Sequence, residues 1–232
     1  MFLAGTTNES ERDAWIKKTL ENIPEGLILL DAGAGESKYK KYCTHLKYVA
    51  QDFGQYEGGG NIGLQEEKWD NSKLDIVSDI TSIPLPDKSV DAIMCTEVFE
   101  HIPDPLPALK EFKRLIKPNG YLILTAPFAS FTHFAPYFFS TGFSRYFYEK
   151  HLPENDFFIE EIILNGNYFE FLAQENRRIK WVARKYAGKK INLIEKIIIH
   201  LNLLILQRLS KRDKGSSEFL CYGVQVIARK NN

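Results

Sequence analysis

Apolar runs and segments of helical periodicity alternate along residues 1–127 of the chain. A run of four or more apolar residues predicts a buried strand, and apolar residues that recur every three or four positions predict an amphipathic helix. Five strands are predicted, at residues 27–33, 46–53, 74–80, 89–97 and 121–127. Helices are predicted at residues 9–22, from Ser37 onward with that serine as the cap, and at residues 105–120. This order indicates an α/β fold with a doubly wound, mostly parallel sheet that helices cover on both faces.

The rest of the chain has a different pattern. We predict a helix at residues 143–156 and two further strands, at residues 157–167 and 219–230. These two strands are expected to pair in antiparallel fashion at the edge of the sheet, which then has seven strands. Residues 166–218, which connect them, are rich in helix formers and are expected to form a helical insertion. Residues 1–232 are therefore predicted to be a single domain with one insertion.

The insertion is basic, although the chain as a whole carries 30 basic and 30 acidic residues. From Asn165 to Glu218 there are 12 Lys or Arg and 5 Asp or Glu, a net charge of +7, and the remainder of the chain carries −7. Residues 177–190 contain seven of these basic side chains. Such a segment could hold a phosphorylated acceptor or an anionic membrane surface, and a solvated face is the simpler explanation.

Residues 191–209, INLIEKIIIHLNLLILQRL, form the most apolar segment of the chain. Polar side chains recur in it at roughly helical spacing, which predicts an amphipathic helix with a wide apolar face. The polar stripe consists of Asn192, Glu195, Lys196, His200, Gln207 and Lys211. An apolar face of this kind packs on its own domain, on a second copy of the chain or on a membrane. Peripheral membrane contact through residues 177–209 and a dimer both stay open.

The overall composition narrows the classes of function. A pI near 7 does not favour a nucleic-acid partner. The three cysteines, Cys43, Cys95 and Cys221, are widely separated, and we interpret them as reduced, mostly buried thiols of a cytoplasmic protein. The first residues lack the basic start and apolar run of an export signal. The expected location is the cytoplasm, with the inner face of the membrane as a variant.

The stretch LILLDAGAGES, residues 27–37, is a strand that breaks into a glycine loop. Such a loop binds the nucleotide part of a cofactor where the strand order of a doubly wound sheet reverses. The dinucleotide fingerprint needs a third glycine at position 38, where this chain has Lys38. A pyrophosphate also avoids negative charge, whereas Asp31 and Glu36 flank this loop. The loop therefore favours a ligand that carries an ammonium and a sulfonium.

Further acids follow successive predicted strands. Asp52 lies 21 residues past Asp31, where a carboxylate can accept both hydroxyls of an adenosine ribose. Asp79, with Ile80, ends the third strand and suits the amino edge and ring face of adenine. Glu97 follows the fourth strand. A glycine-rich segment, residues 54–72, is long and polar enough to be a mobile active-site loop.

Four stretches together resemble the class I S-adenosylmethionine-dependent methyltransferases, and most closely the bacterial group whose fourth strand ends in E-V-x-E-H. They are DAGAGES, VAQDF, VSDITSIPLPDKSVDAIMCTEVFEHIPDP and KEFKRLIKPNGYLILTAP, within residues 27–127. The resemblance implies S-adenosyl-L-methionine as the cofactor. It implies three groups of cofactor contacts: Asp31, Ala32, Gly33 and Gly35 in the methionine-side loop, Asp52, Phe53, Asp79 and Ile80 around the adenosine, and Thr96, Glu97 and Val98 near the sulfonium.

The acceptor pocket is expected just past the fifth strand, in TAPFASFTHFAPYFFSTGFSRYF. Its many aromatic residues and few polar groups are typical of a small-molecule or sugar site. His133 is the preferred general base for a hydroxyl acceptor, and His101 of the EHIPDP stretch is the second candidate. Tyr137, Arg145 and Tyr146 could orient the acceptor, with structural hydrogen bonds as the alternative. No metal site is indicated, because no cluster of His and acidic residues has ligand spacing.

The sequence therefore predicts an S-adenosylmethionine-dependent methyltransferase that O-methylates a small molecule, such as a sugar or a surface-glycan precursor, free or linked to a nucleotide or lipid. This acceptor class would place the enzyme in polysaccharide biosynthesis. An amine or another small metabolite is the alternative acceptor. A non-catalytic cofactor-binding module and an NAD-dependent oxidoreductase are the alternatives of another class. Fold alone does not decide among acceptors.

Overall fold

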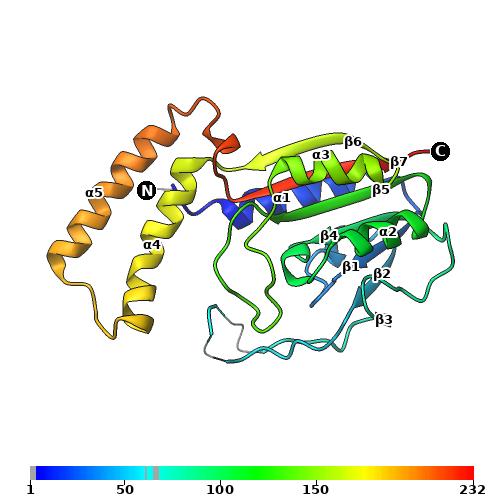
Figure 1. The fold of residues 1–232 in the computed structure, drawn as a ribbon, viewed down its shortest axis with the longest axis horizontal. Helices are drawn as coiled ribbons and strands as arrows, with labels where there is room; N and C mark the ends of the chain where they lie inside the picture. Colours follow the sequence, from blue (N-terminus) through cyan, green and yellow to red (C-terminus); the bar gives the residue numbers. More distant parts are fainter. Residues whose placement is uncertain (1–3, 61, 65–67) are drawn as a thin grey trace. The chain divides into compact units, whose positions relative to one another are not determined.

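The computed structural model describes residues 4–60, 62–64 and 68–232. Within these ranges seven strands form one sheet in the order β3-β2-β1-β4-β5-β7-β6 (Figure 1). The strands are β1 (Ile28–Ala32), β2 (Lys47–Asp52), β3 (Ile76–Val77), β4 (Val90–Thr96), β5 (Ile116–Pro127), β6 (Phe157–Asn165) and β7 (Gly223–Lys230). β1, β2, β3, β4 and β5 pair in parallel, whereas β7 runs antiparallel to β5. The predicted doubly wound, seven-stranded α/β fold is confirmed.

The order of strands reverses between β1 and β4. The chain passes outward from β1 to β2 and β3, and then returns to the other side of β1 to form β4 and β5. The loops that leave β1 and β4 therefore diverge at the carboxyl edge of the sheet. Ligands of doubly wound sheets bind at this position.

Helices α1 (Asn8–Glu21), α2 (Leu106–Leu115) and α3 (Arg145–Glu154) accompany the sheet (Figure 1). α1 buries Ile16 and Leu20 in a cluster that includes Met94 of β4. Side chains alternate along a strand, so the neighbouring Ile93 and Cys95 point to the opposite face, where they are also buried. Both faces of the central strands are thus covered, as the uninterrupted apolar runs predict.

The prediction of a helix that begins at Ser37 is wrong. Only a single 3₁₀ turn, η1 (Lys40–Tyr42), forms there. Ser37 has φ of 59°, the left-handed region, whereas a capping residue needs an extended backbone. The serine therefore makes a turn instead of capping a helix.

Two predicted boundaries also shift. The helix predicted at residues 105–120 ends at Leu115, because the next residue, Ile116, pairs with Val90 and begins β5. The register of β4 and β5 is irregular before Tyr121, and Asn119 in that interval has φ of 60°. The strand predicted at residues 74–80 shrinks to the two residues of β3, an edge strand on which Val77 is 67% exposed.

The expected insertion is helical. It contains α4 (Tyr168–Tyr186), α5 (Leu193–Ser210) and the 3₁₀ turn η3 (Ser216–Glu218). Asn167 caps α4, and Asn192 with Glu195 forms a capping box at the start of α5. The two helices pack against each other through a small cluster that includes Ala173 and Leu206.

The chain divides into two compact units, whereas the sequence predicts a single domain with an insertion. The first unit, here called the sheet unit, is Ala14–Ile163 with Gly223–Asn232. The second, the helical unit, is the described part of residues 1–13 with Leu164–Tyr222, and the predicted insertion makes up most of it. Among the described helices of both units, none has the length and apolar character that crossing a membrane requires.

Candidate functional site

The carboxyl ends of β1, β2 and β4 meet in the sheet unit. The amide of Gly35 donates a hydrogen bond of 3.0 Å to Asp52 Oδ2, at the end of β2. The amide of Gly33 donates at 2.8 Å to the carbonyl of Gln51. Gly33 also lies against Val98, which follows β4. The fold therefore brings together four of the residues that the resemblance implies: Gly33, Gly35, Asp52 and Val98.

Both loop glycines are required by their surroundings. Gly33 has φ of 78° and Gly35 has φ of 50°, in the region that residues with a side chain rarely adopt. A Cβ at Gly33 would lie 2.4 Å from Val98 Cγ2, and a Cβ at Gly35 would lie 2.6 Å from Trp69 Cζ2. The loop can approach β4 and Trp69 this closely only without side chains.

Asp31 offers a buried acceptor at the end of β1. Its side chain is 2% exposed, and the Tyr48 hydroxyl donates to Oδ2. Oδ1 is buried and has no hydrogen-bond partner among the described residues. Burial raises the pKa of Asp31 to about 7, a rise that the Tyr48 hydrogen bond opposes and Asp52 increases. A buried, unpaired carboxylate oxygen beside a side-chain-free loop fits a ligand that brings a cationic donor.

The residues expected around the adenosine differ in their burial and in the hydrogen bonds that they already make within the protein. Asp52 accepts from the amides of Gly35 and Gly54, each at 3.0 Å, so it also holds the two loops. Each carboxylate oxygen has a second lone pair that could accept a ribose hydroxyl. Asp79 is exposed, and its Oδ1 accepts from the Thr81 amide at 2.8 Å and hydroxyl at 2.7 Å. Ile80 beside it is buried.

The end of β4 carries an unusual backbone. Glu97, directly after Thr96, has φ of 54°. Its amide donates to the Thr125 carbonyl at 2.8 Å, and the Thr125 hydroxyl donates to Glu97 Oε1 at 2.9 Å. Positive φ at a residue with a side chain is uncommon and clusters at functional sites. β5 thus holds Glu97 in a conformation that re-aims the chain toward Val98.

Two long segments lie side by side over this edge of the sheet. Leu64, in the glycine-rich segment, forms an isolated parallel bridge with His133. Tyr56 and Trp69 of the same segment contact the ring of Phe134, with centroids 4.6 and 5.0 Å away. Residues 61 and 65–67 of the predicted mobile loop lie outside the described residues. The aromatic contacts join the loop after β2 to the segment after β5.

Glu100, His101 and His133 form a compact cluster next to this edge. Glu100 and His101 belong to the 3₁₀ turn η2 (Phe99–His101), which follows β4. His101 Nε2 and His133 Nε2 each lie 3.7 Å from Glu100 Oε1, longer than a hydrogen bond. His101 Nδ1 is 2.5 Å from the Tyr137 carbonyl oxygen, and His133 Nδ1 is 3.0 Å from that of Phe131. Both predicted bases therefore face the same buried carboxylate.

The three groups of the cluster have perturbed acidities. Burial raises the pKa of Glu100 to about 7, against the effect of His133 and with that of Glu97. Burial and the neighbouring His133 lower the pKa of His101 to about 4. Burial by itself would lower the pKa of His133, but Glu100 and the Phe131 carbonyl outweigh it, so this pKa is raised. Perturbed groups of this kind concentrate at functional sites.

The three predicted acceptor residues, Tyr137, Arg145 and Tyr146, differ in what they contact. Tyr137 lies beside the cluster, since its carbonyl accepts from His101 and its ring lies 4.8 Å from that of Phe53. Arg145 donates to Glu149 Oε1 one turn along α3, at 2.9 Å from Nε. Tyr146 beside it is 63% exposed. These contacts favour the structural alternative for Arg145.

Sequence reasoning missed Glu100, Tyr48 and Trp69 as site residues. Glu100 lies beside a residue that was singled out, His101, and its burial was not visible in the pattern of a short turn. Tyr48 sits on β2 in register with Leu29, two positions before the partner of Asp31, so strand alternation could have indicated it. Nothing local marks Trp69, since its place depends on how the loop folds back.

Comparison with known proteins agrees with this geometry. Residues 30–124 match the family model described as a methyltransferase domain. The chain is similar to the 2-methyl-6-phytyl-1,4-hydroquinone methyltransferase of Synechocystis sp., at 29% identity over 112 residues, 45% of this chain and 33% of the relative. It is similar to the demethylmenaquinone methyltransferase of Bacillus licheniformis at 26% identity over 117 residues, 47% of this chain and 49% of the relative. The chain thus spans half or less of the length of these curated relatives.

A solved structure extends the similarity to the whole fold. An S-adenosylmethionine-dependent methyltransferase from Archaeoglobus fulgidus aligns with a TM-score of 0.57 and 15% identity, covering 96% of this chain and 94% of that chain. The family match favours S-adenosylmethionine, the methyl donor that the resemblance implies, over a dinucleotide. Residues 30–124 therefore contain a methyltransferase domain, and the chain as a whole shares the fold of this S-adenosylmethionine-dependent methyltransferase.

Proposed function

We propose that this protein transfers the methyl group of S-adenosylmethionine to an oxygen atom of a small-molecule acceptor. The observation that carries the proposal is the set of side chains and loop backbone gathered at the ends of β1, β2 and β4. There the buried, unpaired Oδ1 of Asp31 lies in a strand end that continues into the loop of Gly33 and Gly35. A carboxylate lacking a partner suits a cationic cofactor and repels a pyrophosphate.

Different residues of the chain would contact different parts of the cofactor. Asp31 would accept from the ammonium group of the methionine moiety, and Asp52 would accept from the ribose hydroxyls. Asp79 and Ile80 would contact the adenine, whereas Thr96, Glu97 and Val98 would line the sulfonium side. Phe53 and Ala32 complete the walls.

Methyl transfer is an in-line displacement, so the enzyme aligns the acceptor oxygen with the methyl carbon and excludes water. The carbon–sulfur bond breaks as the carbon–oxygen bond forms, and neutral S-adenosylhomocysteine leaves. The proton of an acceptor hydroxyl must go to a base. In this proposal the base is His133 Nε2, because the Phe131 carbonyl occupies Nδ1 and holds the ring.

A sugar or a surface-glycan precursor is our leading acceptor class. The rings of Phe134 and Phe138 lie 5.5 and 5.1 Å from that of His133, and aromatic walls with a few polar groups suit a sugar. An amine or another small metabolite is the alternative acceptor. The names of the relatives include quinol methyltransferases, so a phenolic hydroxyl belongs in the same screen.

Titration calorimetry with S-adenosylhomocysteine tests the cofactor assignment, with NAD as the ligand control. Asp52→Ala should weaken binding, whereas Glu25→Gln, which changes an exposed acid in a turn away from the site, should not. Transfer of a labelled methyl group to candidate hydroxyl, phenol and amine acceptors then tests the activity. A protein that binds NAD but not S-adenosylhomocysteine would refute the proposal. One that binds S-adenosylhomocysteine without any turnover would support the non-catalytic module.

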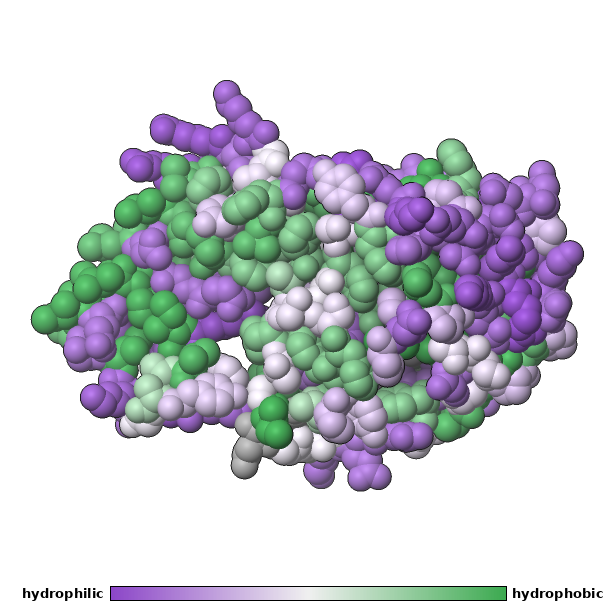
Figure 2. Space-filling model, in the orientation of Figure 1, coloured by the Kyte–Doolittle hydropathy of each residue, from purple (hydrophilic) through white to green (hydrophobic). Residues whose placement is uncertain are grey.

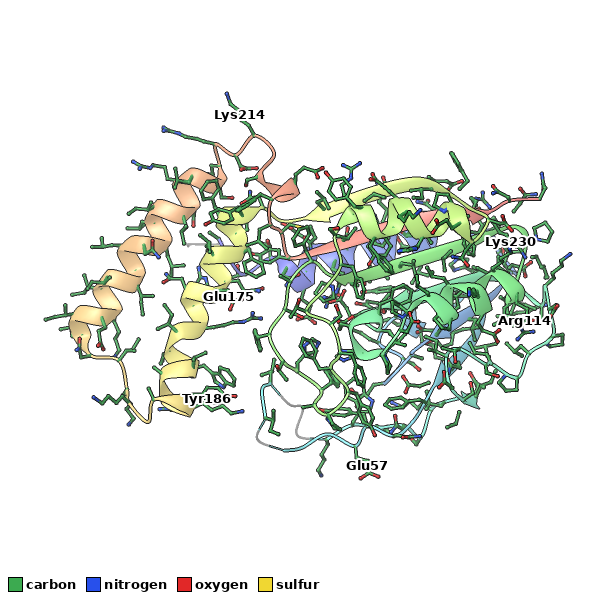
Figure 3. All side chains as sticks on the ribbon, in the orientation of Figure 1. Glu57, Arg114, Glu175, Tyr186, Lys214 and Lys230 are labelled. Carbon is green, nitrogen blue, oxygen red and sulfur yellow. The ribbon has the colours of Figure 1, made fainter. Side chains whose placement is uncertain are left out.

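We also propose that the helical unit contacts an anionic membrane surface. The α4–α5 hairpin exposes large apolar side chains near its tip, with Leu193 71%, Ile194 69% and Ile198 59% exposed (Figure 2). Trp181 and Tyr186, the latter labelled in Figure 3, stand near the end of α4, and Lys185 lies 5.1 Å from the Trp181 ring. Exposed aromatic, basic and apolar side chains in one place are typical of an interfacial anchor.

The positive charge of the hairpin favours an anionic membrane over a second copy of the chain as its partner. Residues 177–190 carry seven basic side chains and no acidic one, so a second copy would bring like charges together, whereas anionic lipids would neutralise them. Flotation with phosphatidylglycerol vesicles should recover the protein, and phosphatidylcholine vesicles or high salt should not. Ile194→Asp should abolish flotation, and Phe158→Asp, which changes an exposed side chain of β6, should not. Absence of flotation, with a dimer that Ile194→Asp dissociates, would overturn the proposal in favour of a second copy.

A further inference from the structure

Glu100 is a fully buried carboxylate without a hydrogen-bond partner. Its side chain has no exposed surface, and neither Oε1 nor Oε2 accepts a hydrogen bond from the described residues. Leaving a carboxylate unpaired away from water is costly, so buried charges are normally paired or coordinate a metal ion. Two imidazole nitrogens face Glu100 Oε1, at 3.7 Å each.

The orientation of the two rings leaves those nitrogens available as ligands. The Nδ1 atoms of His101 and His133 lie at 2.5 and 3.0 Å from the backbone carbonyls of Tyr137 and Phe131. A carbonyl only accepts, so Nδ1 carries the proton of the neutral ring and Nε2 carries the lone pair. Metal-binding histidines are held in this way, with the second ring nitrogen donating to a carbonyl or carboxylate.

We propose that Glu100, His101 and His133 bind a divalent transition-metal ion through a carboxylate oxygen and two Nε2 atoms. The ligand atoms of the three residues all lie within 4.8 Å of one another. Bonds of about 2.0–2.1 Å in tetrahedral geometry place ligand atoms about 3.4 Å apart. The two Nε2–Oε1 separations of 3.7 Å therefore need to close by a few tenths of an ångström, and the bound of 4.8 Å means that no pair of ligand atoms needs to close by more than about 1.4 Å. Two imidazoles and one carboxylate suit Zn²⁺, Fe²⁺ or Mn²⁺.

Backbone contacts hold the three ligands in place. Glu100 and His101 are consecutive in η2, and the Glu100 carbonyl accepts from the amides of Phe139 and Ser140. His133 is fixed by its bridge to Leu64. The segment that carries His133 is therefore tied to η2 directly, and the rings of the two histidines have centroids 4.6 Å apart. The spacing in the sequence conceals this site, because His133 lies 32 residues after His101.

This inference rests on the proposed methyl transfer and deepens it. Three protein ligands leave coordination positions open, as in catalytic metal sites. Those positions would take oxygen donors of the acceptor, such as two neighbouring hydroxyls of a sugar or a phenol. A metal-bound hydroxyl loses its proton more readily, so the ion would replace His133 as the means of activation. The two roles exclude each other, because both use His133 Nε2.

Metal binding is tested on the full chain after dialysis against a chelator. Calorimetric titration with Zn²⁺ should give one ion per chain, and Co²⁺ should develop the visible absorption of a site with few ligands. Glu100→Gln and His133→Gln should each weaken Zn²⁺ binding at least about tenfold, the lower bound for losing even an outer partner of a ligand. His151→Gln, which removes a histidine on α3 paired with Glu154, should leave it unchanged. The affinity of each variant for S-adenosylhomocysteine reports whether it is folded.

The outcomes separate the two proposals. If S-adenosylhomocysteine binds and Zn²⁺ does not, the methyltransferase proposal stands and the metal site is refuted. The metal site would also be refuted if all three variants bound Zn²⁺ with the same affinity, because the ion would then bind elsewhere. If Zn²⁺ binds at this cluster and S-adenosylhomocysteine does not, the metal site stands and the proposed function fails. Methyl transfer that persists in metal-free protein and is inhibited by Zn²⁺ would assign His133 as a base instead.

Discussion

Asp31→Asn should make the protein more stable at alkaline pH and weaker in binding its cofactor. Burial raises the pKa of Asp31 to about 7 from 3.8, so the native state binds more protons than the unfolded state between these values. Stability of the wild type therefore falls as pH rises through this window and stays low above it. The rise of the Asp31 pKa from 3.8 to about 7 corresponds to about 4 kcal/mol of unfolding free energy, at about 1.36 kcal/mol for each pH unit.

The stability gained by Asp31→Asn is smaller than this value of about 4 kcal/mol. Asparagine keeps the acceptor for the Tyr48 hydroxyl, but its amide group would take the place of an oxygen that has no partner. An unsatisfied buried donor costs about 1–3 kcal/mol, so a net stabilisation of about 1–3 kcal/mol is expected at pH 8.5. A lost hydrogen bond between the ammonium and a charged acceptor should weaken S-adenosylhomocysteine about 10- to 100-fold.

Urea unfolding of the ligand-free protein at pH 5 and pH 8.5, with calorimetry, measures both effects. Asp91→Asn is a matched control of opposite sign. The Asp91 carboxylate accepts from Lys117 Nζ at 2.7 Å and from the Ile28 amide at 2.9 Å, and these bonds outweigh its burial, so its pKa is lowered. Its loss should destabilise the protein at pH 8.5. An Asp31→Asn protein that is less stable than the wild type at pH 8.5, or that keeps the same pH dependence, would refute the reasoning.

Other substitutions test the loop, the core and a cap. Gly33→Ala should lower the free energy of unfolding in urea by at least about 1–2 kcal/mol and should also lower the affinity for S-adenosylhomocysteine, because its Cβ would meet Val98 at 2.4 Å. The control, Gly26→Ala, has φ of 82° and open space around it, so it should lower the stability and leave the affinity unchanged. Phe112→Ala removes a fully buried ring of α2 and should cost about 3–5 kcal/mol in the same assay. Asn192→Ala breaks the capping box of α5 and should lower the free energy of opening of its first turn by about 1 kcal/mol, which faster amide exchange would show. The affinity for the cofactor should stay unchanged. Equal exchange rates in the variant and the wild type would contradict the role of the cap.

Much of the sheet unit could be predicted from the sequence because its signals are local. Apolar runs identify β1, β2, β4 and β5, since strands covered on both faces are made largely of apolar residues. The glycines at positions 33 and 35 mark a turn that only glycine tolerates. Acids at strand ends share one edge because parallel strands end together. Where local signals competed the prediction failed, as at Ser37, whose φ of 59° serves the turn after the loop rather than a helix.

The tertiary structure alone decided which side chains face one another at the acceptor side. The neighbourhood of Glu100 and His133 depends on amides of the segment after β5 bonding to the Glu100 carbonyl, and on a bridge between His133 and the glycine-rich segment. Arg145, which the sequence suggested for the acceptor, bonds to Glu149 on its own helix. Periodicity reports whether a residue is buried, and it carries no information on which distant segment covers it. A buried carboxylate facing two histidines is therefore visible only once the loops are folded.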